Sequence, residues 1–330
     1  MKVLVTGATG FIGAHLAIRL HQLGYRVSTT GRNLVNGRKL IENGLRFDAA
    51  DLSNQPEVHA LTKGQDLVFH CGAFSSPWGK YQDFYNSNLL GSEHVIQACL
   101  ENNISRLIYV STPSLHVGGK SQFNIKEDNP FPEGTGSNYT KSKLLAEQAI
   151  DRAFLQGLAV ITIRPRAVFG PGDTSIFPRA IAMLKKKRLP VIGDGKNIVD
   201  LTYIDNVIDA LLLCIESPSD TLGKHFNITN DEPVLLWGVI RSLCDGLRLD
   251  YPTRTIPFNV AYLLGWLMEQ VNSKLPGYPE PPLTRFIACS LANNTTFDIS
   301  LAKKELAYSP LITISEGLAM FMNWWKKNNG

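Results

Sequence analysis

A tyrosine and a lysine four residues apart, Tyr139 and Lys143, form a pair that could transfer a proton. On a helix this spacing places both side chains on one face. A free phenol has a pKa of about 10, so it exchanges protons poorly at neutral pH. A neighbouring ammonium group would stabilise the phenolate and lower the pKa of Tyr139, which would make the phenol a general acid or base. The alternative interpretation is an ordinary pair of side chains on a helix surface.

A hydroxyl group that holds the substrate oxygen is expected just after the predicted strand 107–110. The sequence there is Val-Ser-Thr-Pro-Ser, so the hydroxyls of Ser111, Thr112 and Ser114 compete for this role. Capping of a turn is the alternative role for these groups, and at least one of them must serve it.

A glycine-rich turn at the start of the chain is typical of dinucleotide binding. Gly7, Gly10 and Gly13 lie between a predicted strand, 2–6, and a predicted helix, 11–23. Glycines let the backbone approach a pyrophosphate closely, and the helix N-terminus offers unpaired N–H groups and the positive end of its dipole. The spacing differs from the commoner G-x-G-x-x-G. The alternative is that these glycines serve only the turn and the packing of the helix.

The segment Thr30-Gly31-Arg32-Asn33 bears on the choice between the two nicotinamide cofactors, because it follows the second predicted strand. An acidic residue there would bind the ribose hydroxyls of NAD, whereas an arginine accommodates the extra phosphate of NADP. The segment holds one arginine and no acid, which favours NADP(H) over NAD(H). Arg32 could instead be an exposed loop residue. Asp51 and Leu52, after the third predicted strand, would flank the adenine.

Short runs of β-branched residues alternate with helical patterns along the first half of the chain. This alternation predicts an α/β fold with a doubly wound parallel sheet, because each crossover between parallel strands runs through a helix. The predicted strands are 2–6, 25–30, 45–49, 67–70, 107–110 and 159–163, and the predicted helices include 11–23, 88–102 and 139–156.

The pattern changes after Pro165, where prolines become frequent and the strands less regular. We expect residues 1–165 to form the dinucleotide-binding domain, with 199–228 returning to it, and residues 166–198 and 229–330 to form a smaller substrate lobe. The predicted elements of this half are a helix over 177–187, a strand leading into a helix over 199–214, a strand at 225–228, an apolar helix over 256–268 that covers a pocket or an interface, and an irregular loop with four prolines at 276–282.

The composition excludes several classes of protein. The 330 residues are 44% hydrophobic and 19% charged, which indicates a sizeable core rather than disorder. A net charge of +4 is too small to indicate nucleic-acid binding. The five cysteines are odd in number and widely spaced, so we expect no metal site and a reduced, cytoplasmic protein. We also expect no transmembrane segment, with binding of 256–268 to a membrane surface as the less favoured alternative.

Taken together, these motifs resemble the extended short-chain dehydrogenase/reductase family. The 3β-hydroxysteroid dehydrogenase branch is the most similar, and within it the bacterial reductases of 2-alkyl-3-ketoalkanoic acids from olefin biosynthesis. Ser111 to Ser114 and the segments 281–286 and 295–298 carry that closer resemblance. Besides the glycine turn and the Tyr139/Lys143 pair, the family resemblance rests on the segments 70–73, 88–92, 164–173, 201–207 and 297–310.

The resemblance implies a Rossmann-type enzyme that interconverts a ketone and a secondary alcohol on a hydrophobic substrate, such as a β-keto acid or a sterol-like molecule. In that reaction the cofactor supplies hydride, Tyr139 the proton and Lys143 the pKa shift, and Thr112, or alternatively Ser114, anchors the substrate oxygen. A homodimer is implied by resemblance alone, and Asn88 matches a structural position of the family. The implied cofactor-binding residues are Gly7, Thr9, Gly10, Phe11, Ile12, Gly13, Arg32, Asp51, Leu52, Gly72, Ala73, Tyr139, Lys143, Pro165 and Val168.

Two departures from the family pattern affect the expected function. Sugar-nucleotide epimerases and dehydratases of the family usually carry an asparagine where this chain has Ala167, which weakens the alternative of a sugar-nucleotide epimerase, dehydratase or reductase. The fourth predicted strand ends in Cys71-Gly72-Ala73, where many relatives have two alanines. A second alternative is a non-catalytic NADP-sensing protein, but such proteins commonly lose the tyrosine or the lysine, and this chain keeps both.

Large apolar side chains of the predicted substrate lobe and its surroundings indicate an apolar ligand. Plain core packing is the alternative role for each of them. These residues are Phe74, Trp78, Phe84, Tyr203, Trp237, Phe258, Tyr262, Leu263, Trp266 and Phe286.

Overall fold

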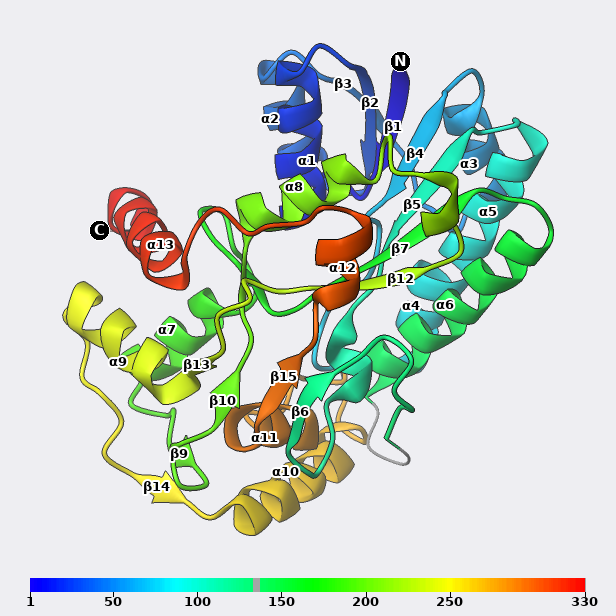
Figure 1. The fold of residues 1–330 in the computed structure, drawn as a ribbon. Helices are drawn as coiled ribbons and strands as arrows, with labels where there is room; N and C mark the ends of the chain where they lie inside the picture. Colours follow the sequence, from blue (N-terminus) through cyan, green and yellow to red (C-terminus); the bar gives the residue numbers. More distant parts are fainter. Residues whose placement is uncertain (133–136, 330) are drawn as a thin grey trace.

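A seven-stranded parallel sheet lies at the centre of the protein, for which a computed structural model describes residues 1–132 and 137–329 (Figure 1). The strand order is β12-β7-β5-β4-β1-β2-β3. The predicted doubly wound α/β fold is therefore confirmed, and the predicted strands fall within two residues of the observed ones. The bounds are β1 (Lys2–Thr6), β2 (Arg26–Gly31), β3 (Arg46–Ala49), β4 (Leu67–His70), β5 (Arg106–Val110), β7 (Val160–Pro165) and β12 (His225–Ile228).

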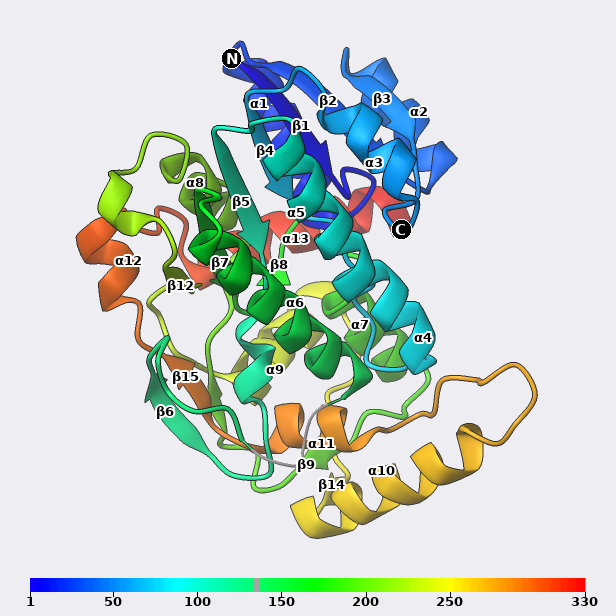
Figure 2. The same ribbon diagram turned by 90° about the vertical axis from the view of Figure 1, so that its right-hand side faces the viewer.

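Helices cover both faces of the sheet, because side chains alternate between two faces that are both buried. On one face Val3 and Val5 pack with α1 (Phe11–Gln22) and α8 (Ile204–Leu213), while Leu4 packs on the other. That second face is covered by α3 (Gln55–Thr62), α5 (Gly91–Glu101) and α6 (Asn138–Leu155), which lie side by side in Figure 2. Helix α2 (Leu34–Glu42) follows β2.

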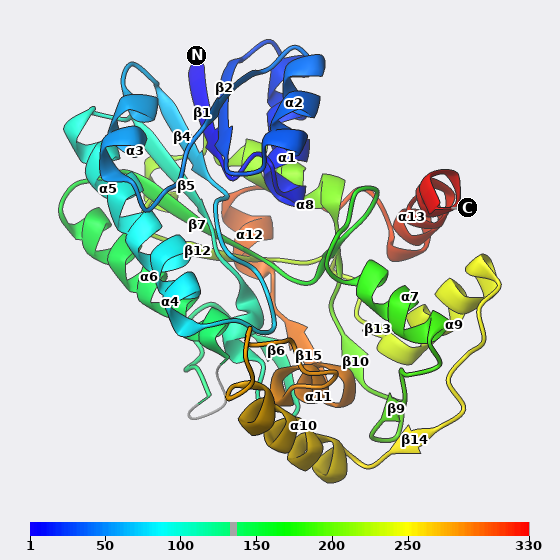
Figure 3. The same cartoon turned by 180° about the vertical axis from the view of Figure 1, so that it is seen from behind.

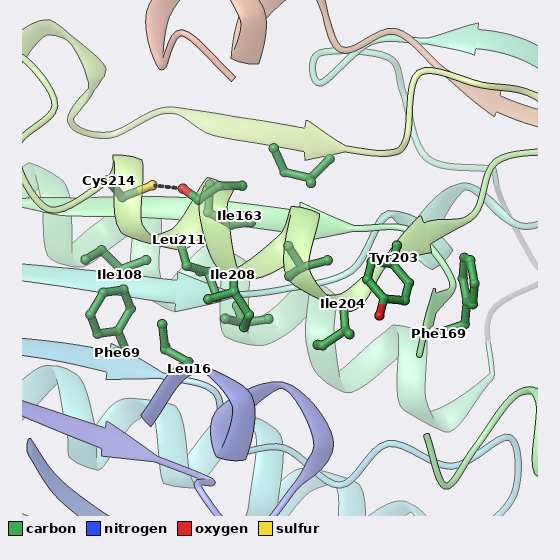
Figure 4. Close-up of a cluster of buried hydrophobic side chains, with 14 of the residues drawn as sticks. Leu16, Phe69, Ile108, Ile163, Phe169, Tyr203, Ile204, Ile208, Leu211 and Cys214 are labelled. Carbon is green, nitrogen blue, oxygen red and sulfur yellow. Dashed lines mark hydrogen bonds between the residues drawn. The ribbon is translucent and has the colours of Figure 1, made fainter. Parts of the chain in front are cut away.

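The close-up in Figure 4 shows how α8 is held against the sheet. Ile208 and Leu211 of α8 point toward Phe69 of β4, Ile108 of β5 and Ile163 of β7, with Leu16 of α1 beside them. These side chains are almost fully buried. At about 25 cal/mol per Å² of apolar surface removed from water, such a contact is a major source of stability.

The segment between β4 and α5 contains a feature that the sequence analysis did not predict. A short helix, α4 (Tyr81–Phe84), continues through a π-helical turn (Tyr85–Leu90) into α5, so the helix predicted at 88–102 begins earlier. Asn88 in this turn is buried and donates from Nδ2 to the Phe74 carbonyl oxygen at 3.1 Å and to Ser142 Oγ at 2.9 Å. Its Oδ1 accepts from the Phe74 N–H at 2.6 Å. Asn88 thus ties the loop after β4 to α6.

Most of the remaining elements form the half of the molecule that lies in the lower part of Figure 3, away from the N-terminus. A four-stranded sheet has the order β13-β10-β15-β6, and two strand pairs join β8 to β11 and β9 to β14. The strands are β6 (Gln122–Ile125), β8 (Val168–Phe169), β9 (Val191–Ile192), β10 (Ile198–Val199), β11 (Thr202–Tyr203), β13 (Val234–Leu235), β14 (Thr255–Ile256) and β15 (Thr295–Phe297).

The helices of this half agree with the sequence pattern where a long apolar repeat is present. The predicted helix over 177–187 corresponds to α7, and the apolar segment predicted over 256–268 is α10, which begins after Pro257. The helices are α7 (Phe177–Lys185), α9 (Leu236–Leu247), α10 (Phe258–Asn272), α11 (Arg285–Ala292), α12 (Ser300–Glu305) and α13 (Ile314–Asn329), with single 3₁₀ turns at Pro113–His116 and Ser219–Thr221.

Parts of the segment 199–228 contact the predicted dinucleotide-binding domain, residues 1–165. β12 pairs with β7 at the edge of the seven-stranded sheet, and α8 packs against α1. The proposed division of the chain into a dinucleotide-binding domain and a substrate lobe stays a prediction. Within the described residues, none of the helices has the length and apolar character needed to cross a membrane.

Candidate active site

A cavity of about 290 Å³ opens at the carboxyl ends of β1, β2, β3 and β4, where parallel sheets bind their ligands. It brings together eight of the predicted cofactor-binding residues: Gly7, Thr9, Gly10, Arg32, Asp51, Leu52, Gly72 and Ala73. It is also lined by six residues that the sequence analysis did not assign: Thr30, Gly31, Asn33, Ala50, Cys71 and Ser87. Four of these are chain neighbours of predicted residues and Thr30 lies two positions before Arg32, whereas nothing in the sequence pointed to Ser87.

The glycines of the first turn are required by close approach of the backbone. Gly7 has a φ of +66°, and a Cβ atom on it would lie 2.5 Å from the Gly72 Cα atom. A Cβ atom on Gly13 would lie 2.5 Å from the Gly7 carbonyl oxygen. Gly10 is the N-cap of α1, and no acidic residue stands in the first turn of that helix. The turn therefore suits a pyrophosphate, which the α1 N-terminus would attract.

The other predicted cofactor residues do not line this cavity. Phe11, Ile12 and Gly13 form the first turn of α1, and Gly13 serves the packing of the glycine turn. Pro165 ends β7 and Val168 begins β8. Their roles toward a cofactor stay predictions.

Arg32 and Asp51 face each other across the cavity mouth. Arg32 Nη1 lies 3.6 Å from Asp51 Oδ2, and both side chains are about half exposed, so this ion pair is weak. Desolvation opposes ionisation of Asp51, but hydrogen bonds from the N–H and hydroxyl of Ser53, together with Arg32, lower the pKa of its carboxyl. An anion that entered the cavity would compete with Asp51 for the guanidinium of Arg32.

Tyr139 stands in the first turn of α6, which Ser137 caps by accepting a hydrogen bond from the Thr140 N–H at 3.2 Å. Desolvation raises the pKa of the Tyr139 phenol, and hydrogen bonds with the hydroxyls of Ser75 and Thr112 oppose this rise. The sequence predicted that Lys143 lowers the pKa of Tyr139. In the structure burial dominates and this pKa is raised, so the prediction is wrong for the protein's own groups. The sequence analysis missed Ser75, whose only signal is its place in the loop after β4.

Lys143 has a different partner from the one that the sequence predicted. Its side chain is buried, and Nζ donates to the Tyr109 hydroxyl at 2.6 Å and to the Val110 carbonyl oxygen at 2.8 Å. Burial lowers the pKa of Lys143 to about 7, although the charge of Glu147 opposes the shift. The amino group of Lys143 is therefore held against β5, and it is only partly protonated at neutral pH.

The two candidate anchors for the substrate oxygen differ in their surroundings. Thr112 caps the 3₁₀ turn by accepting a hydrogen bond from the Ser114 N–H at 3.1 Å, and its hydroxyl also contacts Tyr139. Ser114 Oγ instead accepts a hydrogen bond from Arg166 Nη1 at 3.2 Å. This geometry favours Thr112 as the anchor beside Tyr139, and the assignment stays a prediction.

A second cavity, of about 210 Å³, lies next to the start of α6. Three of the predicted apolar residues line it, namely Trp78, Phe84 and Phe286. Trp78 stacks on Tyr278 with ring centres 4.8 Å apart and donates from Nε1 to the Tyr278 carbonyl oxygen at 3.2 Å. The cavity is also lined by Pro77, Gly79, Ser137, Asn138, Lys141, Glu269, Gln270, Ser273, Tyr278, Thr284 and Arg285.

The other predicted apolar residues have different surroundings. Tyr203 and Trp237 are buried in the core. Leu263 and Trp266 are exposed on α10. For Tyr203 and Trp237 the alternative of core packing is correct.

Comparisons with known proteins agree with this arrangement. The chain matches the sequence model of the NAD dependent epimerase/dehydratase family over residues 3–229. The 2-alkyl-3-oxoalkanoate reductase of Stenotrophomonas maltophilia (strain K279a) is 35% identical over 324 residues, which span 96% of this chain and 97% of the relative. Sterol-4-alpha-carboxylate 3-dehydrogenase, decarboxylating, of Mus musculus is 32% identical over 328 residues, which span 96% and 89%.

Solved structures show the same fold. The UDP-glucuronic acid 4-epimerase from Bacillus cereus, in complex with NAD, superposes with a TM-score of 0.79 over 100% of both chains at 24% identity. At this identity the likeness bears on the fold alone.

Proposed function

Because the chain belongs to the NAD dependent epimerase/dehydratase family and is an enzyme of the extended short-chain dehydrogenase/reductase type, we propose that it is an NADP(H)-dependent oxidoreductase. It interconverts a ketone and a secondary alcohol on a hydrophobic substrate. The observation that carries this proposal is the contact of the Tyr139 phenol with the Thr112 hydroxyl, in a chain whose glycine turn lines a cavity at the carboxyl ends of the strands.

Each residue has a defined task in this reaction. The bound nicotinamide cofactor supplies or accepts the hydride. Tyr139 gives its proton to the substrate oxygen during reduction and takes it back during oxidation, while Thr112 holds that oxygen, with Ser114 as the alternative. Lys143, one helical turn from Tyr139, would hydrogen-bond the nicotinamide ribose. The pyrophosphate would lie on Gly7, Thr9 and Gly10.

The surroundings of Arg32 support NADP(H) over NAD(H). The last residue of β2 is Gly31, and the next two are Arg32 and Asn33, so the position that would hold an acid for NAD carries none. A 2′-phosphate would attract the guanidinium of Arg32 away from its weak ion pair with Asp51. The UDP-glucuronic acid 4-epimerase structure with the same fold holds NAD, so the proposed preference for NADP(H) rests on the sequence of this chain alone.

A β-keto acid is the substrate class that we favour, with a sterol-like molecule as the alternative. The two similar relatives are named for 2-alkyl-3-oxoalkanoate and for sterol-4-alpha-carboxylate. Both names describe a carboxylate close to the carbon at position 3, where the oxygen is reduced or oxidised. Trp78, Phe84 and Phe286 in the second cavity are suited to the apolar part of such a molecule.

The direct test is to follow the absorbance of NADPH with the purified protein and a long-chain 3-oxo acid. Turnover with NADPH would support the proposal. The alternative of a sugar-nucleotide enzyme is tested in parallel by thermal shift with UDP- and dTDP-sugars, because such enzymes must bind the nucleotide. A sugar-nucleotide that stabilises the protein, without any ketone reduction, would contradict the proposal. Cofactor binding without turnover on a broad set of ketones would favour a non-catalytic NADP-sensing protein.

We also propose that the enzyme acts in the cytoplasm as a homodimer, by resemblance to its family. Light scattering during size-exclusion chromatography measures the mass directly. A mass near twice 36.5 kDa is expected, and a monomer would contradict the proposal.

A further inference from the structure

Arg166 is a buried arginine for which the protein supplies few partners. It directly follows Pro165, the last residue of β7, and only 6% of its surface is exposed. Nη1 donates to Ser114 Oγ at 3.2 Å, and Nε is buried without a hydrogen-bond partner. Among the residues that the structure describes, no carboxylate lies within ion-pair distance of this guanidinium.

Arg164, two residues earlier, shows how this fold satisfies a buried arginine. It is equally buried, and its Nε and Nη2 donate to the two carboxylate oxygens of Glu147 at 3.0 and 2.6 Å. Its Nη1 donates to the Glu127 carbonyl oxygen at 3.1 Å. Buried charges are normally paired in this way, because an unpaired one is costly. Within residues 1–132 and 137–329, Arg166 has no such anion.

Asp200 does not supply the missing anion. Its charge acts on Arg166, but the two side chains do not form an ion pair. Its Oδ2 accepts a hydrogen bond from the Phe297 N–H at 2.7 Å, and burial raises the pKa of its carboxyl to about 6. The Phe297 ring also lies against Arg166, with its centre 5.8 Å from the guanidinium carbon.

Arg166 is close to the proposed reacting group. Its hydrogen-bond acceptor, Ser114, donates its N–H to Thr112 Oγ1 at 3.1 Å, and the Thr112 hydroxyl contacts the Tyr139 phenol. Two residues therefore connect the guanidinium to the position where the substrate oxygen would lie. The carboxylate carbon of a 3-oxo acid is separated from the carbonyl carbon by a single carbon atom, so its charge must lie near that position.

We propose that Arg166 binds the carboxylate of a 3-oxo acid while Tyr139 and Thr112 hold its ketone oxygen. This inference rests on the proposed ketone reduction. The planar guanidinium can donate two parallel hydrogen bonds to a carboxylate, which fixes the orientation of the acid as well as its charge. Arg166 is thus the residue that makes the enzyme select acids over uncharged ketones.

The test compares 3-oxododecanoate with its methyl ester, using NADPH and three proteins: wild type, Arg166→Gln and the control Arg46→Gln. Arg46 is an exposed arginine at the start of β3, paired only with Asp48. We expect the wild type and the control to prefer the acid in kcat/KM by about 10- to 100-fold, the usual effect of a hydrogen-bonded charge. Arg166→Gln should lose this preference, because its kcat/KM falls much more for the acid than for the ester.

Binding of dodecanoate and methyl dodecanoate to the NADP⁺-loaded proteins, by isothermal titration calorimetry, gives a readout independent of turnover. The wild type should bind the acid at least about 10-fold more tightly than the ester, and Arg166→Gln should bind both alike. Arg166→Lys keeps the charge without the planar fork, so it should recover part of the preference if Arg166→Gln does not fold.

Several outcomes would overturn the inference. Equal binding of acid and ester by the wild type would do so without any variant, as would an acid preference retained in Arg166→Gln. Absence of reduction of either ketone, together with dodecanoate binding that depends on Arg166, would instead overturn the proposed reaction and leave the carboxylate site standing.

Discussion

Tyr139 and Lys143 share a helix face, yet their polar groups interact with different parts of the molecule. The Tyr139 phenol contacts Ser75 and Thr112, whereas Nζ of Lys143 is bonded to Tyr109 and Val110 on β5. The protein therefore stabilises a Tyr139 phenolate through hydroxyl groups, while the charge of Lys143 is held against β5. That charge is itself limited by burial, which lowers the pKa of Lys143 to about 7.

The lowered pKa of Lys143 makes the stability of the free protein depend on pH. In the unfolded chain a lysine has a pKa of about 10.4, so between pH 7 and 10 the unfolded state binds the extra proton. The cost of burying the charge is fully present below pH 7 and is lost as the pH rises toward 10. Relative to Lys143→Met, the wild type should therefore gain about 2 kcal/mol or more between pH 7 and 9.5, measured by urea unfolding. An unchanged difference would contradict the assigned pKa.

Arg32 determines the cofactor preference in this account. Arg32→Ala should weaken NADPH binding by about 10-fold or more and change NADH binding by less than about 2-fold, because only NADPH carries the 2′-phosphate. Fluorescence titration of the two nucleotides measures both affinities. Arg46→Ala is the matched control, since it removes an exposed arginine from the opposite end of the neighbouring strand. Equal weakening of both nucleotides by Arg32→Ala would overturn the NADP(H) assignment.

At the scale of elements, the site depends on how the loop after β4 is attached to α6. Ser75 and Trp78 belong to the loop, Tyr139 belongs to the helix, and Asn88 in the π-helical turn bridges the two segments. A π-helical turn often marks a functional site, because it shifts the register of the side chains that follow. Here the turn places the buried Asn88 amide where it bonds both the backbone of the loop after β4 and a side chain of α6.

Removal of that bridge should destabilise the protein and disturb the site. Asn88→Ala leaves the Phe74 N–H and carbonyl oxygen and the Ser142 hydroxyl without their partner, which should cost about 2 to 4 kcal/mol in urea unfolding. Asn86→Ala is the control, because Asn86 accepts only an exposed hydrogen bond from Gln82. A loss below about 1 kcal/mol for Asn88→Ala would show that the bridge is not needed.

The elements that the sequence predicted are those with a strong local signal. The short runs at 2–6 and 67–70, which are rich in apolar residues, gave strands with those same bounds, because buried parallel strands are largely apolar. β6 and β15 were not predicted, since Gln122–Ile125 and Thr295–Phe297 are short and pair with partners far away in the chain. The glycine turn was predictable from spacing, but the bonding of Lys143 to Tyr109 was not, because it depends on tertiary packing of α6 against β5.

At the scale of the whole molecule, two cavities meet the requirements of one reaction. The first lies over the glycine turn at the carboxyl ends of β1 to β4, where a dinucleotide would bind. The second lies beside the start of α6 and combines aromatic side chains with polar and charged ones. Tyr139 belongs to α6 and contacts Ser75, which follows β4, and Thr112, which follows β5, so it lies at the carboxyl ends of these two strands.

The central claim is that the Tyr139 phenol transfers the proton that accompanies the hydride. Tyr139→Phe removes only the hydroxyl, so a single-turnover measurement of NADPH oxidation with a 3-oxo acid tests this claim directly. The account predicts a loss of at least about 100-fold in the rate of the hydride step, with NADPH affinity within about 2-fold of wild type. A rate within a few-fold of wild type would mean that another group supplies the proton, and the mechanism proposed for this site would be wrong.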